Sequence, residues 1–326
     1  MRTRNPTLAG LAPALVGLAL AVGATGLAGC ASGDGGSAGG PTVVATTSIL
    51  GDVVTNIVGD DARVEVLMAP GVDPHEFQLS ARQAAQLQDA DAIVANGLGL
   101  EEGLSDAIAS AAVDGVPVYE VAPHLDPLPF AAEPGGGGGD DATDALDPHV
   151  FTDPRRMADG VGGIADALAE AVPTLDTPAV HDRADAYADD LRAADAESER
   201  ALSAVAPDRR ILVTNHEVLG YFADRYDFEI IGAVVPSGTT LAEPSSQELS
   251  DLAHTIRDTG VPAIFTDATS PTELADSLAD ETGIDVQVVP LFTESLGEPG
   301  SGAETYLQMV EYNADAIATA LSGGSP

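Results

Sequence analysis

The sequence contains no lysine, and its 13 basic residues, all of them arginine, are far outnumbered by 52 aspartates and glutamates. The formal net charge is -39 at pH 7. Nucleic-acid binding needs a basic surface that neutralises phosphates, so this composition excludes nucleic acid as a partner. Hydrophobic residues still make up 44% of the chain, which is enough to build a core. A high-salt environment and a GC-rich genome both produce such acidity, and composition does not separate them.

Cysteine is almost absent. Cys30 is the only one in the chain, so no internal disulfide can form. It ends the stretch MRTRNPTLAGLAPALVGLALAVGATGLAGC, in which two arginines precede an apolar run and then small residues. This pattern predicts a lipoprotein signal peptide over residues 1–29, because the final LAGC resembles the lipobox at which bacterial lipoproteins are acylated. A lone buried thiol at a signal cleavage site is the alternative.

An acylated Cys30 would anchor the mature protein to the outer face of the cytoplasmic membrane. Residues 30–41, rich in glycine and serine, would form a lipidated flexible tether. Apart from the signal, no apolar stretch approaches the roughly 20 residues of a membrane-spanning helix. We therefore expect an extracytoplasmic, lipid-anchored protein, at the cell surface or in the periplasm.

Short apolar runs alternate with amphipathic segments on either side of one long helical stretch. Strands separated by helices of about ten residues predict βαβ units and mostly parallel sheets. The predicted fold is α/β, with two Rossmann-like lobes over 42–173 and 207–326 joined by one long rigid linker helix within 174–206. The expected strands are 42–47, 62–68, 91–97, 116–122, 209–215, 228–234, 262–267 and 285–291.

Several helix starts are marked by capping residues. Thr177 followed by proline predicts the start of the linker helix, and Ser245 with Glu248 predicts a capping box. Ser270, followed by a proline, is expected to cap a helix, and His216 to begin one. A glycine- and aspartate-rich loop over 131–147 is expected to be mobile, as a solvated tether rather than a lid or a cation-collecting segment.

The motif Asp-Pro-His occurs twice, ending at His75 and at His149. Proline fixes its own φ and biases the preceding residue toward extended geometry, so the imidazole is presented from a stiff corner. His216 follows the predicted strand 209–215, and Glu294 follows the predicted strand 285–291. In open α/β sheets, ligands bind at the carboxyl ends of strands.

Three imidazoles and one carboxylate form a common first shell for a divalent transition metal, and for zinc in particular. Each histidine alone could be an ordinary surface or capping residue. Four such residues at element ends in both lobes predict a metal site made of His75, His149, His216 and Glu294. The other histidines lack a matching motif, so we expect structural or solvent roles for them: His124, His181 and His254.

Other acidic residues near these motifs have two interpretations. Asp73 and Asp147 either orient the histidines that follow them or serve as ordinary turn residues. Glu217, Glu243 and Asp267 could approach the site, but in a chain with 52 acidic residues a solvated surface position is the simpler expectation for each.

Several segments together resemble the solute-binding lipoproteins of bacterial zinc/manganese ABC transporters, often called cluster A-I. They are GVDPHEFQLSARQ, DPHVFTDP, NHEVLGYFADRY, EPSSQELSDLAHTIRDTG, LFTESLG and YLQMVEYNADAIATAL, and they span nearly all of 42–321. The resemblance implies a monomeric two-lobed receptor that passes a metal ion to a permease powered by an ATPase. The family's ligands map onto His75, His149, His216 and Glu294, although the last is usually aspartate. Some members are also associated with cell adhesion.

Zinc and manganese are both compatible with this resemblance. Three imidazoles favour zinc, and manganese-specialised members often carry a carboxylate at the position of His216. Zinc-dedicated members, however, often have histidines in the insert where this chain has glycine and aspartate. We predict capture of Zn²⁺ and delivery to the transporter, with manganese or mixed uptake as the alternative.

Two other classes of function are less favoured. A zinc hydrolase would use three histidines, a metal-bound water and Glu294 as base, but the chain has no H-E-x-x-H motif and no nucleophile elbow. A purely structural surface lipoprotein would leave the four predicted ligands without a role. The protein is therefore predicted not to be an enzyme.

Overall fold

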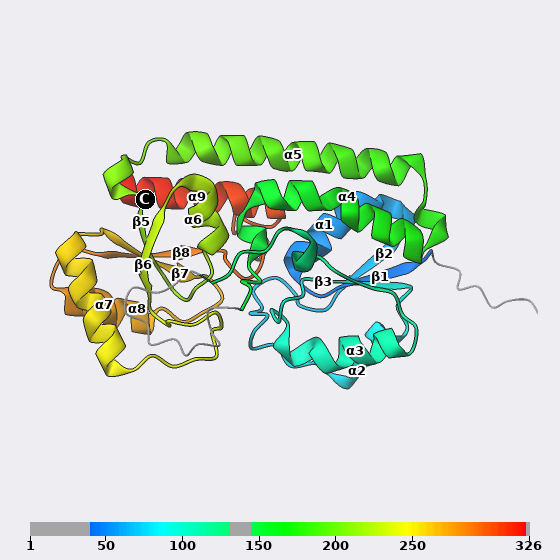
Figure 1. Ribbon diagram of the computed structural model, residues 1–326, viewed down its shortest axis with the longest axis horizontal. Coiled ribbons are helices and arrows are strands. Elements are labelled where there is room, and N and C mark those ends of the chain that lie inside the picture. The colour runs from blue at the N-terminus through cyan, green and yellow to red at the C-terminus, as the bar shows by residue number, and fades with distance from the viewer. Residues whose placement is uncertain (1–39, 131–144, 324–326) are drawn as a thin grey trace, which may run out of the picture. The chain divides into compact units, whose positions relative to one another are not determined.

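Two four-stranded sheets, both entirely parallel, organise the part of the chain that the computed structural model describes, residues 40–130 and 145–323 (Figure 1). The first has the order β2-β1-β3-β4 and the second the order β6-β5-β7-β8, so the two share one topology. We call the first sheet with its helices the N-terminal lobe and the second the C-terminal lobe. The strands are β1 Thr42–Ala45, β2 Arg63–Val66, β3 Ala92–Ala95, β4 Val118–Glu120, β5 Ile211–Thr214, β6 Glu229–Ala233, β7 Ala263–Asp267 and β8 Gln287–Leu291.

Both sheets are covered on both faces. Alternate residues of β1 enter different cores, Val43 and Ala45 on one side and Val44 on the other. In the C-terminal lobe, Phe265 and Ile264 separate in the same way. This alternation is the pleat of a strand buried on both faces, as parallel sheets require. Ligand access is thereby confined to the ends of the strands.

The connecting helices are amphipathic. In α4, Met157, Val161, Ile164 and Leu168 are buried, a spacing of three and four residues that forms one apolar stripe. The helices other than the linker are α1 Ser48–Val58, α2 Ala81–Gln88, α3 Ser105–Val113, α4 Pro154–Ala171, α6 Gly220–Tyr226, α7 Ser246–Thr259, α8 Glu273–Thr282 and α9 Tyr306–Ser322. None of the helices in the described part of the chain is long and apolar enough to cross a membrane.

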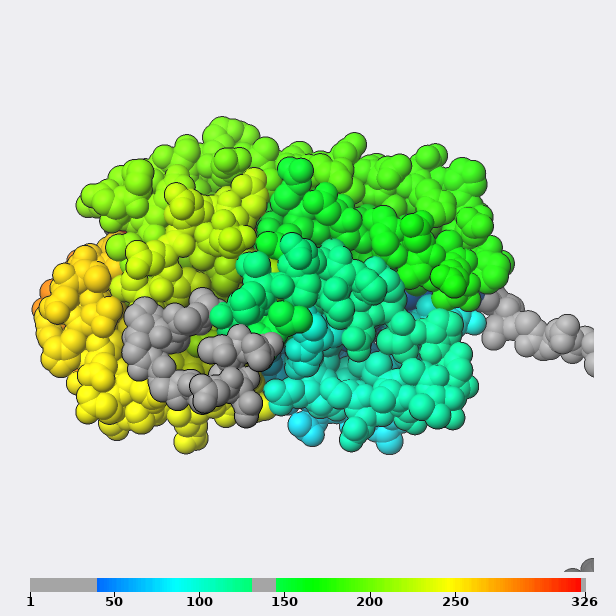
Figure 2. Space-filling view, in the orientation of Figure 1, coloured from blue at the N-terminus to red at the C-terminus, as the bar shows by residue number. Residues whose placement is uncertain are grey.

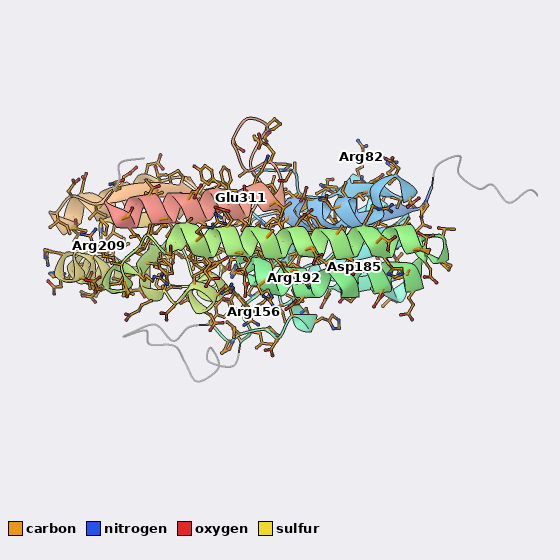
Figure 3. All side chains as sticks on the ribbon, turned by 90° about the horizontal axis from the view of Figure 1, so that it is seen from above. Arg82, Arg156, Asp185, Arg192, Arg209 and Glu311 are labelled. Carbon is orange, nitrogen blue, oxygen red and sulfur yellow. The ribbon has the colours of Figure 1, made fainter. Side chains whose placement is uncertain are left out.

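The linker helix α5 runs over Pro178–Leu202, and its 25 residues span about 38 Å. As predicted, it begins after Thr177, whose side chain accepts the Val180 N–H. It packs against α4, α9 and α1, and Figure 3 shows it lying between α4 on one side and α9 and α1 on the other. In Figure 2, the green surface of α4 and α5 adjoins both the cyan surface of the N-terminal lobe and the yellow surface of the C-terminal lobe. The predicted fold class, two α/β lobes joined by a long helix, is confirmed.

Some boundaries differ from the predictions. The helix α6 begins at Gly220, so His216 lies in the turn between β5 and α6 and not inside the helix. The N-cap of α8 is Thr272, and neither it nor Ser270 caps the helix through its side chain. The capping box of α7, formed by Ser245 and Glu248, is confirmed. The predicted signal peptide, Cys30 and loop residues 131–144 lie outside the described residues.

Candidate metal centre

The four predicted ligands lie in loops that follow strands or precede short helices. His75 lies in the loop after β2, and His149 directly precedes the 3-10 turn Val150–Thr152. His216 follows β5, and Glu294 follows β8. All four are buried, with exposed fractions of 3% for His75, 0% for His149 and His216, and 1% for Glu294. Residues separated by more than 200 positions thus meet in one enclosed cluster.

Their donor atoms lie at the spacing of a metal shell. Each residue offers one atom, and all four atoms lie within 4.8 Å of one another. The two Nε2 atoms of His75 and His149 are 3.3 Å apart, and Glu294 Oε1 is 3.0 Å from His216 Nε2 and 3.6 Å from His149 Nε2. Tetrahedral coordination at about 2.0–2.1 Å places ligand atoms about 3.3 Å apart. These three distances between donor atoms are therefore close to the spacing in a tetrahedral zinc shell.

Five of the eight polar side-chain atoms of these four residues lack a hydrogen-bond partner. Both ring nitrogens of His216 and both carboxyl oxygens of Glu294 are buried without a hydrogen bond, as is His75 Nδ1. His216 and Glu294 approach closely, but their orientation does not make a hydrogen bond. Buried polar atoms are normally paired, and leaving one unpaired costs about 1–3 kcal/mol. A cation bound between the side chains would satisfy Glu294 and one ring nitrogen of His216.

Burial also sets the protonation states of the cluster. Desolvation lowers the pKa of His75 to about 3, with further lowering by the neighbouring histidines. Desolvation likewise lowers the pKa values of His149 and His216. The pKa of Glu294 is raised well above its usual range by desolvation and then by nearby carboxylates. The imidazoles are therefore neutral, which is the form that binds metal ions.

Asp147 orients the ring of His149. Its Oδ1 lies 2.7 Å from His149 Nδ1 and also accepts the His149 backbone N–H at 2.9 Å. Because Oδ1 is already the acceptor for the backbone N–H of His149, it also accepts from Nδ1, which places the ring proton on Nδ1 and leaves Nε2 free for a metal. Desolvation raises the pKa of Asp147 to about 7, and the hydrogen bond from His149 opposes this. Of the two interpretations of Asp147, the structure supports the orienting one.

Asp73 has a different role. Its Oδ1 accepts the backbone N–H of His75 at 2.8 Å but does not contact the ring. Its Oδ2 accepts the hydroxyl of Thr240, in the loop after β6, at 2.7 Å. Asp73 therefore fixes the turn that carries His75 and joins it to the C-terminal lobe, a contact that the sequence does not indicate.

Asp267 was expected at a solvated surface, and this expectation is wrong. It is fully buried at the end of β7. Its Oδ2 accepts the backbone N–H of Thr293 at 3.0 Å and the Thr293 hydroxyl at 2.5 Å, while Oδ1 accepts the Thr269 N–H at 2.7 Å. Asp267 thereby fixes the residue directly before Glu294. It was missed because one buried aspartate is not distinguishable by sequence among 52 acidic residues.

The residue directly after Glu294 is fixed from the opposite lobe. Ser295 Oγ lies 3.0 Å from the hydroxyl of Ser48, the first residue of α1, and accepts the backbone N–H of Gly71 at 2.9 Å. Ser48 also accepts the backbone N–H of Leu296 at 3.0 Å. The turn that carries Glu294 is therefore held by both lobes. It cannot shift freely to accommodate a shorter or longer side chain at position 294.

The remaining histidines are outside the cluster, as predicted. His124 stacks on Tyr119 with ring centroids 5.0 Å apart, His181 lies near acidic residues on and beside the linker helix, and His254 Nδ1 contacts the carbonyl of Ser250 in its own helix. Glu217 and Glu243 are not among the four clustered residues. The geometry thus selects three of the six histidines.

A two-lobed solute-binding protein is the class that these features define: two parallel α/β lobes, one long connecting helix and one buried donor cluster between the lobes. The chain belongs to the family described as zinc-uptake complex component A periplasmic, whose model matches residues 43–320. The family resemblance drawn from the sequence motifs is therefore confirmed.

Curated relatives with different printed metals are about equally similar to the chain. It is 31% identical over 290 residues to the zinc-binding protein TroA of Treponema pallidum, covering 87% of this chain and 90% of that protein. It is 29% identical over 284 residues to the manganese-binding lipoprotein MntA of Halalkalibacterium halodurans, covering 87% and 89%. The iron-binding protein YfeA of Yersinia pestis is 29% identical over 276 residues, covering 85% of each chain. Overall similarity thus does not identify a metal.

The solved structure of periplasmic zinc-binding protein TroA from Treponema pallidum has the same fold. It matches with a TM-score of 0.77 and 30% identity, over 87% of this chain and 99% of that one. Its agreement over 99% of its own length supports the two-lobed architecture of the matched part of this chain.

Proposed function

We propose that the protein captures a divalent transition-metal ion, Zn²⁺, outside the cytoplasm and delivers it to an ABC transporter permease with its ATPase. The observation that carries the proposal is the cluster of four buried donor residues whose donor atoms lie within 4.8 Å of one another, with His216 and Glu294 making no side-chain hydrogen bond. His75, His149, His216 and Glu294 would be the ligands. The family and the zinc-binding relative support the same role.

Zinc is favoured over manganese by the chemistry of the ligands. Three neutral imidazoles suit zinc, whereas manganese prefers carboxylate, carbonyl and water oxygens. Two distances between donor atoms, 3.3 Å and 3.0 Å, are also close to the spacing in a tetrahedral zinc shell. Manganese remains the alternative, because a manganese-binding relative is nearly as similar to this chain as the zinc-binding one.

We further propose a binding role without catalysis. Four protein ligands complete a tetrahedral shell and leave no position for an activated water, so the site would hold metal without hydrolysing a substrate. The protein would act as a monomer. Its chain would divide into a signal over 1–29, a tether over 30–41 acylated at Cys30, lobes over 42–173 and 207–326, and a linker within 174–206.

Competition binding tests this proposal. The mature chain is offered Zn²⁺ and Mn²⁺ together with a series of chelators, and the bound metal is quantified. We expect one tightly held Zn²⁺, a loss of affinity by orders of magnitude in His149→Ala, and no change in the control His254→Ala, whose side chain is exposed and outside the cluster. His216→Glu should shift the preference toward manganese.

Three results would contradict parts of the proposal. Preference of the wild type for Mn²⁺ would keep the four ligands but change the transported metal. Unchanged affinity in a folded His149→Ala variant would remove His149 from the site. Absence of any tightly bound metal would refute the proposed function.

A further inference from the structure

Tyr221 connects the two lobes next to the cluster. It lies on α6, five residues after His216, and its side chain is fully buried. Its hydroxyl donates to the carbonyl of Asp147 at 2.6 Å and accepts the backbone N–H of Leu128 at 2.9 Å. Asp147 and Leu128 are also joined by a backbone hydrogen bond of 2.8 Å. One phenol from the C-terminal lobe therefore holds two segments that precede α4.

Gly220, the first residue of α6, lies against the side-chain carboxyl group of Asp147. A Cβ atom added to Gly220 would lie 2.7 Å from Asp147 Oδ2, so the helix backbone lies directly against this carboxyl group. The other oxygen, Oδ1, faces His149 Nδ1 at 2.7 Å. Two adjacent residues of α6 thus confine both the backbone and the side chain of the residue that orients His149.

The ring of Tyr221 is itself held in place. The guanidinium of Arg156, labelled in Figure 3, lies 5.2 Å from the centroid of the ring. Arg156 also donates to the carbonyls of Leu125 and Asp126 at 3.1 and 2.6 Å and pairs with Asp224 at 3.4 Å. The tyrosine is therefore not free to change its rotamer when the metal site empties.

We infer that Tyr221 is a positioning residue for metal capture: through Asp147 it fixes the Nε2 atom of His149 relative to the donor atoms of the other lobe. The inference rests on the proposed function, in which His149 and His216 bind one ion. Tyr221 and His216 both belong to the segment 216–221. The hydrogen bond from the Tyr221 hydroxyl to Asp147 therefore fixes the distance between His216 in one lobe and His149, which Asp147 orients. The ion would then bind to side chains whose positions are already fixed, so the binding free energy loses less to the ordering of these side chains.

Tyr221→Phe removes only the hydroxyl and keeps the ring. We expect Zn²⁺ affinity to fall about 10- to 100-fold, the usual effect of losing a partner that orients a metal ligand. Tyr226→Phe is the matched control, because it lies on the same helix, is also buried, and donates its hydroxyl to Asp195 of the linker helix at 3.1 Å. Tyr221→Phe loses the hydrogen bonds to the Asp147 carbonyl and the Leu128 N–H, whereas Tyr226→Phe loses the one to Asp195, so only the first variant loses contacts next to the site.

The measurements separate positioning from general stability. Chelator competition gives the affinity, thermal unfolding gives the stability, and nitrogen NMR of labelled histidine reports the ring of His149 in the metal-free protein. We expect a broadened or shifted His149 signal and weakened binding in Tyr221→Phe, with both unchanged in Tyr226→Phe. Gly220→Ala, which pushes on Asp147 without removing the phenol, should change the same signal and affinity and provides a second variant if Tyr221→Phe does not fold.

The inference is overturned if Tyr221→Phe and Gly220→Ala bind Zn²⁺ as tightly as Tyr226→Phe and leave the His149 signal unchanged. In that case His149→Ala would still show impaired binding, and the proposed function would stand. If the wild type binds no metal, or if His149→Ala binds normally, the proposed function fails and the inference fails with it.

Discussion

Shortening Glu294 by one methylene is the sharpest test of how rigid the site is. In the wild type, Glu294 Oε1 lies 3.0 Å from His216 Nε2 and 3.6 Å from His149 Nε2. Glu294→Asp withdraws the carboxylate by roughly one carbon–carbon bond, about 1.5 Å. Because aspartate carries the same carboxylate, the chemistry of the group alone would lead one to expect no effect. The structure leads to the opposite expectation, because the turn around residue 294 cannot move inward.

Two contacts prevent that movement. Thr293 is held by its hydroxyl and backbone N–H to the fully buried Asp267, and Ser295 is held to Ser48 of the other lobe. Removing one partner of a buried charged pair costs about 3–5 kcal/mol. Aspartate keeps the charge but misplaces it, so we expect roughly half of that loss, about 2 kcal/mol, or about a thirtyfold weaker Kd for Zn²⁺.

The assay is chelator competition on the wild type, Glu294→Asp, Ser48→Ala and the double variant. Ser48→Ala removes the hydroxyl that contacts Ser295 and Leu296, and so releases the turn. If rigidity causes the loss, the double variant should bind more tightly than the sum of the two single effects predicts. Wild-type affinity in Glu294→Asp, or strict additivity in the double variant, would refute the reasoning.

Three further predictions follow from the same structure. Since burial raises the pKa of Glu294 and lowers the pKa of His75 to about 3, Zn²⁺ binding at pH 5.5 should release at least one proton, and the Zn²⁺ affinity should fall as the pH falls. Binding to the Glu294→Gln variant should release about one proton fewer. Calorimetry in buffers of different ionisation enthalpy measures the number of protons released, and a binding enthalpy that does not depend on the buffer would contradict the prediction. Gly103→Ala should lower the free energy of unfolding by about 1–3 kcal/mol, since the added Cβ would lie 2.1 Å from the Phe77 carbonyl oxygen. The control is Gly162→Ala, whose added Cβ meets no atom within 4 Å. Equal denaturation midpoints for the two variants would be inconsistent with the prediction. Cys30→Ser should abolish lipid labelling and leave an unprocessed precursor, and normal acylation of the variant would disprove the lipobox assignment.

The fold and the donor residues could be predicted because they depend on local patterns. Strands buried on both faces appear in the sequence as short apolar runs, and Thr177 followed by Pro178 indicates the start of the long linker helix. The four clustered residues could be proposed as ligands because Asp-Pro-His is a stiff and uncommon motif that occurs twice. Since the carboxyl ends of parallel strands collect ligands, residues far apart in sequence could be placed together before any coordinates were known.

The supporting contacts could not be predicted, because their partners are distant and their residue types are common. Ser48 and Ser295 are 247 positions apart, Thr240 and Asp73 are 167 apart, and Tyr221 reaches Asp147 over 74. A lone serine or threonine carries no sequence signal for such a contact. Asp267 was misjudged for a related reason, since the abundance of acidic residues made a solvated position the default expectation.

The acidity of the chain acts in two physically different ways. Most acidic residues of the described part of the chain are at least partly exposed, and the charge there would raise the local concentration of any cation and would be screened beyond about 10 Å at moderate salt. By contrast, Asp73, Asp147 and Asp267 are buried around the cluster, and each is fixed by hydrogen bonds from backbone or side-chain groups. Buried groups are screened much less than exposed ones. Under the proposed function, selectivity would therefore come from the donor types and spacing of the enclosed cluster, because the surface charge attracts all cations alike.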